Sequence, residues 1–285
     1  MSTQWECAKD EAIVNQHFAK LGDVWKHLPL AEVLRINPPQ QYWETHAGSA
    51  TYPLSDSPPR LHGALRFLAQ APREPQLARC AYLQVLQSMP GVYPGSPMLA
   101  MRVLGNRASY LFCDTDPESA RSLGEASRDL NVRVVNRDGV STVAQEADSV
   151  ALDPSGVLIH IDPFDPHERQ TPNSMTPVEL AASLARRGFR LFYWYGYDDV
   201  DDRGWARAEI ARLAPGVELW CGDVLIPSPF VYPERGGAWG CGIVLANLTQ
   251  EEAASCSQLG RALERISADD ILSPNDPPGL TFAVI

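Results

Sequence analysis

The feature that most constrains the fold is a regular alternation of short apolar runs with segments of helical periodicity. After a helix that starts at the loop YPGSP (93–97), we expect strands at 109–113, 132–135, 157–161 and 190–195, two further apolar runs at 217–226 and 240–247, and a last strand at 281–285. Helical periodicity lies between them, at 117–128, 140–147, 177–187, 203–213 and 249–266. The pattern predicts an α/β protein with a mostly parallel sheet that helices cover on both faces.

The amino-terminal third departs from this alternation. We expect a helix over 8–36 and a short strand over 41–44. The segments LHGALRFLAQ and LARCAYLQVLQ then predict two helices inserted before the next strand, and prolines interrupt them. We therefore expect one domain over 1–285 that contains a helical insertion over 58–92.

Composition narrows the classes of function. No stretch approaches the roughly 20 apolar residues of a membrane span, and the amino terminus lacks the features of a secretion signal, so we expect a soluble, cytoplasmic protein. The cysteines form no CxxC pair, so no metal site is predicted. The net charge of −11 disfavours nucleic acid as a partner, although a local basic face of Arg186, Arg187 and Arg190 would weaken that objection.

Two common nucleotide-binding motifs are absent. The segment THAGSA is not the glycine-rich GxGxxG fingerprint of dinucleotide-binding enzymes, and no GxxxxGK[ST] loop is present for a nucleoside triphosphate. A dehydrogenase and a P-loop enzyme are therefore disfavoured.

Glycines and acidic residues follow successive predicted strands, at the edge where parallel sheets bind ligands. Gly48 would let the backbone approach a ligand closely, or would only form a tight turn. Asp114 is placed to accept hydrogen bonds from two ribose hydroxyls, or to cap a helix; Asp116 is the better cap. Asp138 could accept the amine of an adenine, or form an Asp-Gly turn with Gly139.

Two further segments could bind polar groups of a ligand. Ser96 lies where a helix begins, which favours a carboxylate site or a structural cap. Asp162 and Pro163 could hold an amino group, and Phe164 could stack on a base. The alternative for the segment Asp-Pro-Phe-Asp-Pro is a proline-stiffened turn.

Together these segments resemble a known family. The segments DVWKH (23–27), ETHAG (44–48), YPGSP (93–97), RDG (137–139) and IDPF (161–164), with Asp114, are similar in order to the landmarks of the RlmJ-type large-subunit ribosomal RNA adenine-N6 methyltransferases. THAG and YPGSP are the most specific of these, and the resemblance spans most of the chain.

The resemblance implies a class I methyltransferase sheet, Rossmann-like, with an antiparallel final strand, in a monomeric protein. It implies S-adenosylmethionine as cofactor and a methyl transfer to an adenine nitrogen of ribosomal RNA. The residues implied in cofactor binding are Lys26, His46, Gly48, Ser96, Asp114, Asp138 and Asp162. Asp162 would also hold the target amine, in a catalytic segment formed with Pro163 and Phe164.

The chain departs from the family on the acceptor side. The family's Asp-Pro-Pro-Tyr is here Asp-Pro-Phe-Asp (162–165), which moves the aromatic ring by one place, and the family's amino-terminal Tyr and His residues are reduced to His17 with AKLG. The segment YDDVDD (197–202) crowds four aspartates that would repel a phosphate backbone. Three functions therefore stay open: an RNA methyltransferase, a methyltransferase of a small nucleoside or amine, and an inactive cofactor-binding homologue.

Overall fold

A computed structural model describes residues 18–226, 239–268 and 280–285. Within these residues the main sheet has eight strands in the order β10-β8-β9-β7-β6-β1-β4-β5. Their bounds are β1 Gln41–Glu44, β4 Ser109–Cys113, β5 Val132–Val135, β6 Val157–Ile161, β7 Arg190–Tyr197, β8 Leu219–Ile226, β9 Trp239–Ala246 and β10 Thr281–Val284.

The five strands from β5 to β7 run parallel, because each connection between them passes through a helix. The strand β9 is antiparallel to both β7 and β8, and β10 is antiparallel to β8. The fold-class prediction is confirmed in its architecture: the sheet is mostly parallel and Rossmann-like, with helices on both faces. The final strand is antiparallel, as the resemblance implied.

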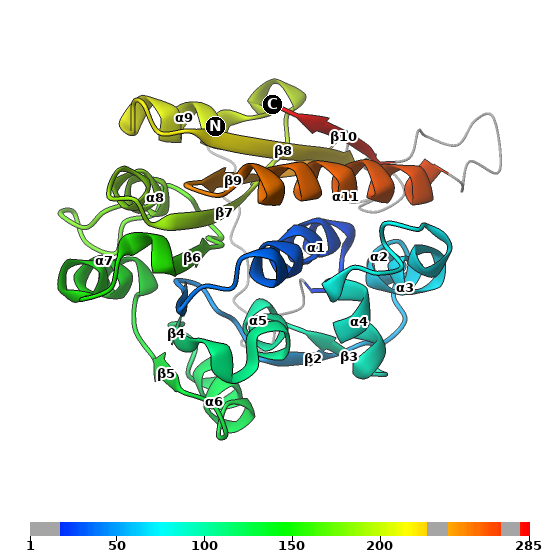
Figure 1. The fold of residues 1–285 in the computed structure, drawn as a ribbon, viewed down its shortest axis with the longest axis horizontal. Helices are drawn as coiled ribbons and strands as arrows, with labels where there is room; N and C mark the ends of the chain where they lie inside the picture. Colours follow the sequence, from blue (N-terminus) through cyan, green and yellow to red (C-terminus); the bar gives the residue numbers. More distant parts are fainter. Residues whose placement is uncertain (1–17, 227–238, 269–279) are drawn as a thin grey trace, which may run out of the picture.

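Helices cover both faces of the sheet (Figure 1). On one face, α1, α5, α6 and α11 share a hydrophobic core with the sheet, and on the other α7, α8 and α9 share a second one. The bounds are α1 Leu21–Ile36, α5 Ser96–Leu104, α6 Pro117–Ala126, α7 Gly139–Ser149, α8 Pro177–Arg186, α9 Trp205–Leu213 and α11 Gln250–Ala268. Burial on both faces explains why β6 (VLIHI) has no exposed residue.

The segment predicted as a helical insertion contains three short α-helices, α2 (Pro58–Leu61), α3 (Ala64–Gln70) and α4 (Ala81–Ser88), and the 3-10 turn η1 (Ala71–Arg73). A pair of antiparallel strands, β2 (Thr51–Pro53) and β3 (Val92–Pro94), flanks these helices; the sequence analysis did not predict it. Short 3-10 turns also lie at η2 (Gly105–Arg107), η3 (Pro154–Gly156) and η4 (Val200–Asp202).

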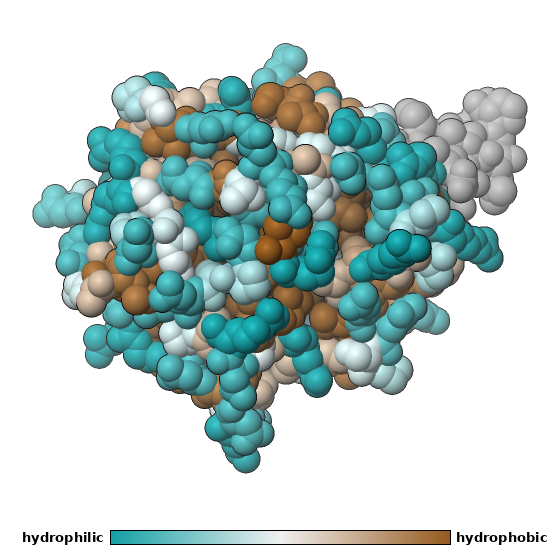
Figure 2. Space-filling view, viewed as in Figure 1, coloured by the Kyte–Doolittle hydropathy of each residue, from teal (hydrophilic) through white to brown (hydrophobic). Residues whose placement is uncertain are grey.

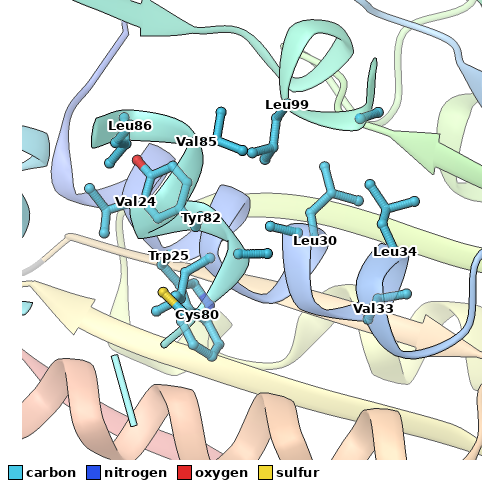
Figure 3. Close-up of a cluster of buried hydrophobic side chains, with 14 of the residues drawn as sticks. Val24, Trp25, Leu30, Val33, Leu34, Cys80, Tyr82, Val85, Leu86 and Leu99 are labelled. Atoms are coloured by element: carbon cyan, nitrogen blue, oxygen red, sulfur yellow. The ribbon is translucent and has the colours of Figure 1, made fainter. Parts of the chain in front are cut away.

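The insertion packs on α1 through a shared apolar cluster. Figure 3 shows side chains from α1, α4 and α5 gathered in this cluster, among them Val24, Trp25, Leu30, Val33, Leu34, Cys80, Tyr82, Val85, Leu86 and Leu99. Trp25 is fully buried and its indole nitrogen donates to the Gly222 carbonyl of β8. The helix α1 is therefore fixed between the sheet and the insertion.

One helix boundary differs from the prediction. Residues 8–17 of the predicted helix 8–36 lie outside the described residues, and α1 begins at Leu21. Ala19 has a positive φ of 61°, a conformation that a right-handed helix cannot contain.

Hydrophilic residues predominate on the face seen in Figure 2, with apolar residues in scattered patches. No helix among the described residues is long and apolar enough to cross a membrane.

Candidate active site

A cavity of about 240 Å³ opens at the carboxyl ends of the parallel strands. In the strand order, β1 lies between β4 and β6, so the chain continues from β1 to one neighbour and later returns to the other. Ligands usually bind at such a point in a parallel sheet. Its lining comes from the ends of β1, β4 and β5 and from the segment after β6: Thr45, His46, Asp114, Thr115, Asp138, Gly139, Val140, Phe164, Asp165, Glu168, Gln170, Met175 and Pro177.

Asp114 fixes the loop that follows β1. One carboxylate oxygen accepts the Gly48 N–H at 2.7 Å and the other accepts the Asp116 N–H at 2.8 Å. Asp116 itself caps α6, as predicted, because its side chain accepts the N–H groups of Glu118 and Ser119. A carboxylate has about four acceptor sites, so Asp114 keeps acceptor capacity toward the cavity.

Gly48 has a φ of +64°, which favours glycine, and an added Cβ would lie 2.7 Å from the Tyr52 hydroxyl. Of the two roles considered for Gly48, the structure therefore shows the tight turn. Gly48 does not line the cavity. Its N–H donates to Asp114, which does line the cavity.

Asp138 lines the cavity and also caps α7. Its carboxylate accepts the N–H groups of Val140 at 3.4 Å and Ser141 at 2.8 Å. Gly139 packs directly on the backbone of Thr45, so that an added Cβ would overlap the Thr45 carbonyl. Asp138 therefore has a structural role at the start of α7, and it also lines the cavity.

Ser96 does not cap a helix, so that alternative is wrong: it is the first residue of α5, and Gly95 is its N-cap. The Ser96 hydroxyl donates to Glu44 at 2.9 Å, and Tyr42 donates to the other Glu44 oxygen. The Nδ1 atom of His160 lies 3.6 Å from that second oxygen. Glu44 and His160 are each 1% exposed, and their buried network lies beside the cavity, not in its lining.

Glu44 belongs to the segment ETHAG, but no role was predicted for it from the sequence. The available signal was its position as the last residue of β1, where the other parallel strands also deliver acidic residues.

Lys26 and Asp162 form a buried ion pair. The Lys26 ammonium lies 2.6 Å from Asp162 and 3.2 Å from Asp23, one turn earlier on α1. Burial alone raises the pKa of Asp162, but the charge of Lys26, followed by that of His160, outweighs it and lowers that pKa below 3.8. Burial lowers the pKa of Lys26, and the two carboxylates reverse this and raise it. The structure therefore joins two predicted site residues from α1 and the end of β6.

His46 lines the cavity as a neutral side chain. Its Nδ1 atom lies 2.7 Å from the Thr45 hydroxyl. Burial lowers the pKa of His46 from 6.5, against the charges of Asp162, Asp114 and Asp138, which raise it. His46 can therefore exchange hydrogen bonds with a ligand at neutral pH without adding a positive charge.

The segment Asp162-Pro163-Phe164 crosses from the ion pair to the cavity. Asp162 is half-buried, Pro163 is buried, and Phe164 is 99% exposed although it lines the cavity. A closed aromatic pocket of Trp194, Tyr195, Tyr197 and Phe164 would favour a small acceptor, but the described residues do not form one. Tyr195 and Tyr197 are buried under α9, and Trp194 packs in the core on the opposite face, because successive strand side chains alternate.

Arg190 cannot contribute to the basic face that was considered with Arg186 and Arg187, because it is 3% exposed and pairs with Glu252. Arg187 pairs with Asp148. Both arginines lie near the start of β7, at the edge of the sheet opposite the cavity. Among the cavity-lining residues are four carboxylates, Asp114, Asp138, Asp165 and Glu168, and no lysine or arginine.

No protein-family model matches the chain, and no curated protein matches it. Among solved structures, the chain is similar to protein LPL1258 from Legionella pneumophila, which carries the family-model description DUF519; the TM-score is 0.68 at 19% identity, over 94% of this chain and 98% of that one. A probable spermidine synthase from Corynebacterium glutamicum matches at a TM-score of 0.45 and 14% identity, over 92% of this chain and 74% of that one.

Aeropyrum pernix fibrillarin, solved with natively bound S-adenosyl-L-methionine, matches at a TM-score of 0.39 and 12% identity, over 76% of each chain. Of these likenesses, the one to the Legionella protein establishes a shared fold over nearly the whole of both chains. The resemblance to RlmJ-type enzymes stays a prediction.

Proposed function

We propose that this chain is an S-adenosylmethionine-dependent methyltransferase that acts on an amino nitrogen. The observation that carries the proposal is the cavity at the carboxyl ends of β1, β4 and β5, where Asp114, Asp138 and His46 converge beside the Lys26–Asp162 pair. These five residues come from five segments of the sequence, α1 and the ends of β1, β4, β5 and β6, and each was expected at a cofactor site.

The residues present suit the chemical groups of this cofactor. Asp114 keeps acceptor positions for ribose hydroxyls, and Asp138 with the apolar Val140 borders the part of the cavity suited to a base. Lys26 supplies a cation for the cofactor's carboxylate. Four acidic side chains in the lining suit a ligand that carries a positively charged sulfonium.

The chain's own contribution to catalysis would be to position the reactants. When bound, the cofactor supplies an electrophilic methyl group. Methyl transfer to an amino nitrogen then needs that nitrogen in line with the methyl group and its protons directed to acceptors. Asp162 is ionised and can accept such a proton in a hydrogen bond, and the exposed Phe164 ring at the cavity can stack on a flat acceptor.

The acceptor named by the resemblance is an adenine of ribosomal RNA, with methylation at N6. The exposed ring of Phe164 supports a base as the acceptor. A second candidate, a small nucleoside or amine, is favoured by the cavity's four carboxylates and by the exposed aspartates 198, 199, 201 and 202 after β7. A phosphate backbone would be repelled there, whereas a small amine would not.

Calorimetric titration with S-adenosylmethionine and S-adenosylhomocysteine tests the cofactor. We expect micromolar binding of both, and the absence of binding by folded protein would contradict the proposal. Methyl transfer to unmodified ribosomal RNA and to small amines then identifies the acceptor. Asp162→Ala should abolish transfer, while Asp153→Ala, which removes an exposed carboxylate outside the site, should not. Full turnover by Asp162→Ala would show that Asp162 has no role in the reaction.

A further inference from the structure

Lys26 has two largely buried carboxylate partners that lie on different elements. Asp162 belongs to the segment after β6, whereas Asp23 lies three residues before Lys26 on the same helix, α1. The side chains of Lys26, Asp23 and Asp162 are 11%, 15% and 17% exposed. The second oxygen of Asp23 accepts the Lys20 N–H at 3.1 Å, which fixes the carboxylate at the start of the helix.

This arrangement allows one partner to change while the other stays. The helix α1 is held between the sheet and the insertion, so the distance between Asp23 and Lys26 is set by the helix itself. Asp162 is the residue expected to serve an amine. If Asp162 turned to that amine, Lys26 would still have a buried counter-ion in Asp23, which avoids the high cost of an unpaired buried charge.

We propose that Asp23 is a positioning residue that holds the Lys26 ammonium for the cofactor's carboxylate while Asp162 serves the amine. The inference rests on the proposed function. The amino-acid end of the cofactor carries one negative and one positive charge. It can therefore enter beside the Asp23–Lys26–Asp162 trio without changing the net buried charge, with its carboxylate toward Lys26 and its ammonium toward Asp162.

Calorimetry with two ligands tests this role. S-adenosylhomocysteine carries the amino-acid end, and 5′-methylthioadenosine keeps the adenosine and the sulfur but lacks it. We expect Asp23→Asn to weaken the first about tenfold, which is about 1.4 kcal/mol, and to leave the second unchanged, since only the first has a carboxylate for Lys26 to bind. Asp23→Glu, which restores the charge, should recover most of the loss.

Three further variants make the result specific. Lys26→Met should remove the preference for S-adenosylhomocysteine, and Asp23→Asn added to it should have no further effect, because the two residues act as one unit. Asp162→Asn should keep the preference within about threefold, because Asp23 still holds Lys26. This variant decides the question if Asp23→Asn does not fold. Glu32→Gln, which removes an α1 carboxylate that pairs with Arg35, is the matched control.

The binding measurements distinguish an error in the proposed function from an error in the role of Asp23. If the wild-type protein binds neither ligand, the proposed function is wrong, and the role of Asp23 falls with it. If the wild-type protein binds S-adenosylhomocysteine but Asp23→Asn keeps its affinity, or weakens both ligands equally, the positioning role alone is overturned. Loss of the preference in Asp162→Asn would likewise overturn it, because Asp162 would then be the residue that holds Lys26.

Discussion

Asp223 gives the protein a pH-dependent stability that can be calculated from its surroundings. It lies on β8, fully buried, and accepts a hydrogen bond from the Tyr195 hydroxyl at 2.8 Å. Burial raises the pKa of Asp223 from 3.8 to about 6, although the Tyr195 hydroxyl and the charge of Arg203 lower it. The folded protein therefore binds this proton more tightly than the unfolded chain does.

The direction and size of the effect follow from this difference. A raised pKa in the folded state contributes stability that is fully present below pH 3.8 and is lost as the pH rises through about 6. At about 1.4 kcal/mol for each tenfold change in proton affinity, the loss is about 3 kcal/mol. Asp223→Asn keeps the shape of the side chain and cannot ionise, so it should lack this loss.

The assay is urea unfolding of both proteins at several pH values from 4 to 8, followed by tryptophan fluorescence. We expect the wild-type free energy of unfolding to fall relative to that of Asp223→Asn by about 2.5 kcal/mol over this range, mostly between pH 4 and 6.5. Comparison with the variant cancels the other carboxylates. Asp129→Asn, at an exposed carboxylate, is the matched control. Parallel curves for wild type and Asp223→Asn would show that Asp223 does not titrate between the folded and unfolded states as expected.

Two further predictions concern the sheet and the site. Glu252→Ala should lower the free energy of unfolding by about 4 kcal/mol, because it leaves the buried Arg190 without its partner; the double variant Arg190→Met/Glu252→Leu should recover most of this in urea unfolding, and equal losses would contradict it. Gly139→Ala should cost about 1–3 kcal/mol and weaken S-adenosylhomocysteine in calorimetry, because the added Cβ would displace Thr45. Gly124→Ala, where the space is open, is its control.

Much of the site was predictable because of one geometric rule. The carboxyl ends of parallel strands meet at one edge of a sheet, so residues that directly follow predicted strands become neighbours. Asp114, Asp138 and Phe164 were chosen on this basis, and all three line the cavity. Asp116 could be identified as a helix cap because Asp at the N-cap followed by Pro at the first helical position is a common start of a helix, and it depends only on adjacent residues.

Other features could not be read from neighbouring residues. The ends of predicted helices differ by a few residues, and the start of α1 depended on the backbone at Ala19. Arg190 looked like part of a basic face, but its strand lies in the core, where Glu252 of a distant helix pairs with it. The burial of Tyr195 and Tyr197 under α9 depends likewise on which face of β7 each side chain takes, and on how α9 packs there.

The alternation of strands and helices, the mostly parallel sheet and the acidic edge could be predicted from the amino-acid sequence, since they depend on local periodicity and on short motifs. The partners of the charged groups could not, because they are set by contacts between distant segments. Lys26 meets Asp162 across 136 positions of sequence, and Ser96 meets Glu44 across 52. Such pairs depend on how α1 and α5 pack against the ends of β1 and β6, and that packing is set by the whole hydrophobic core.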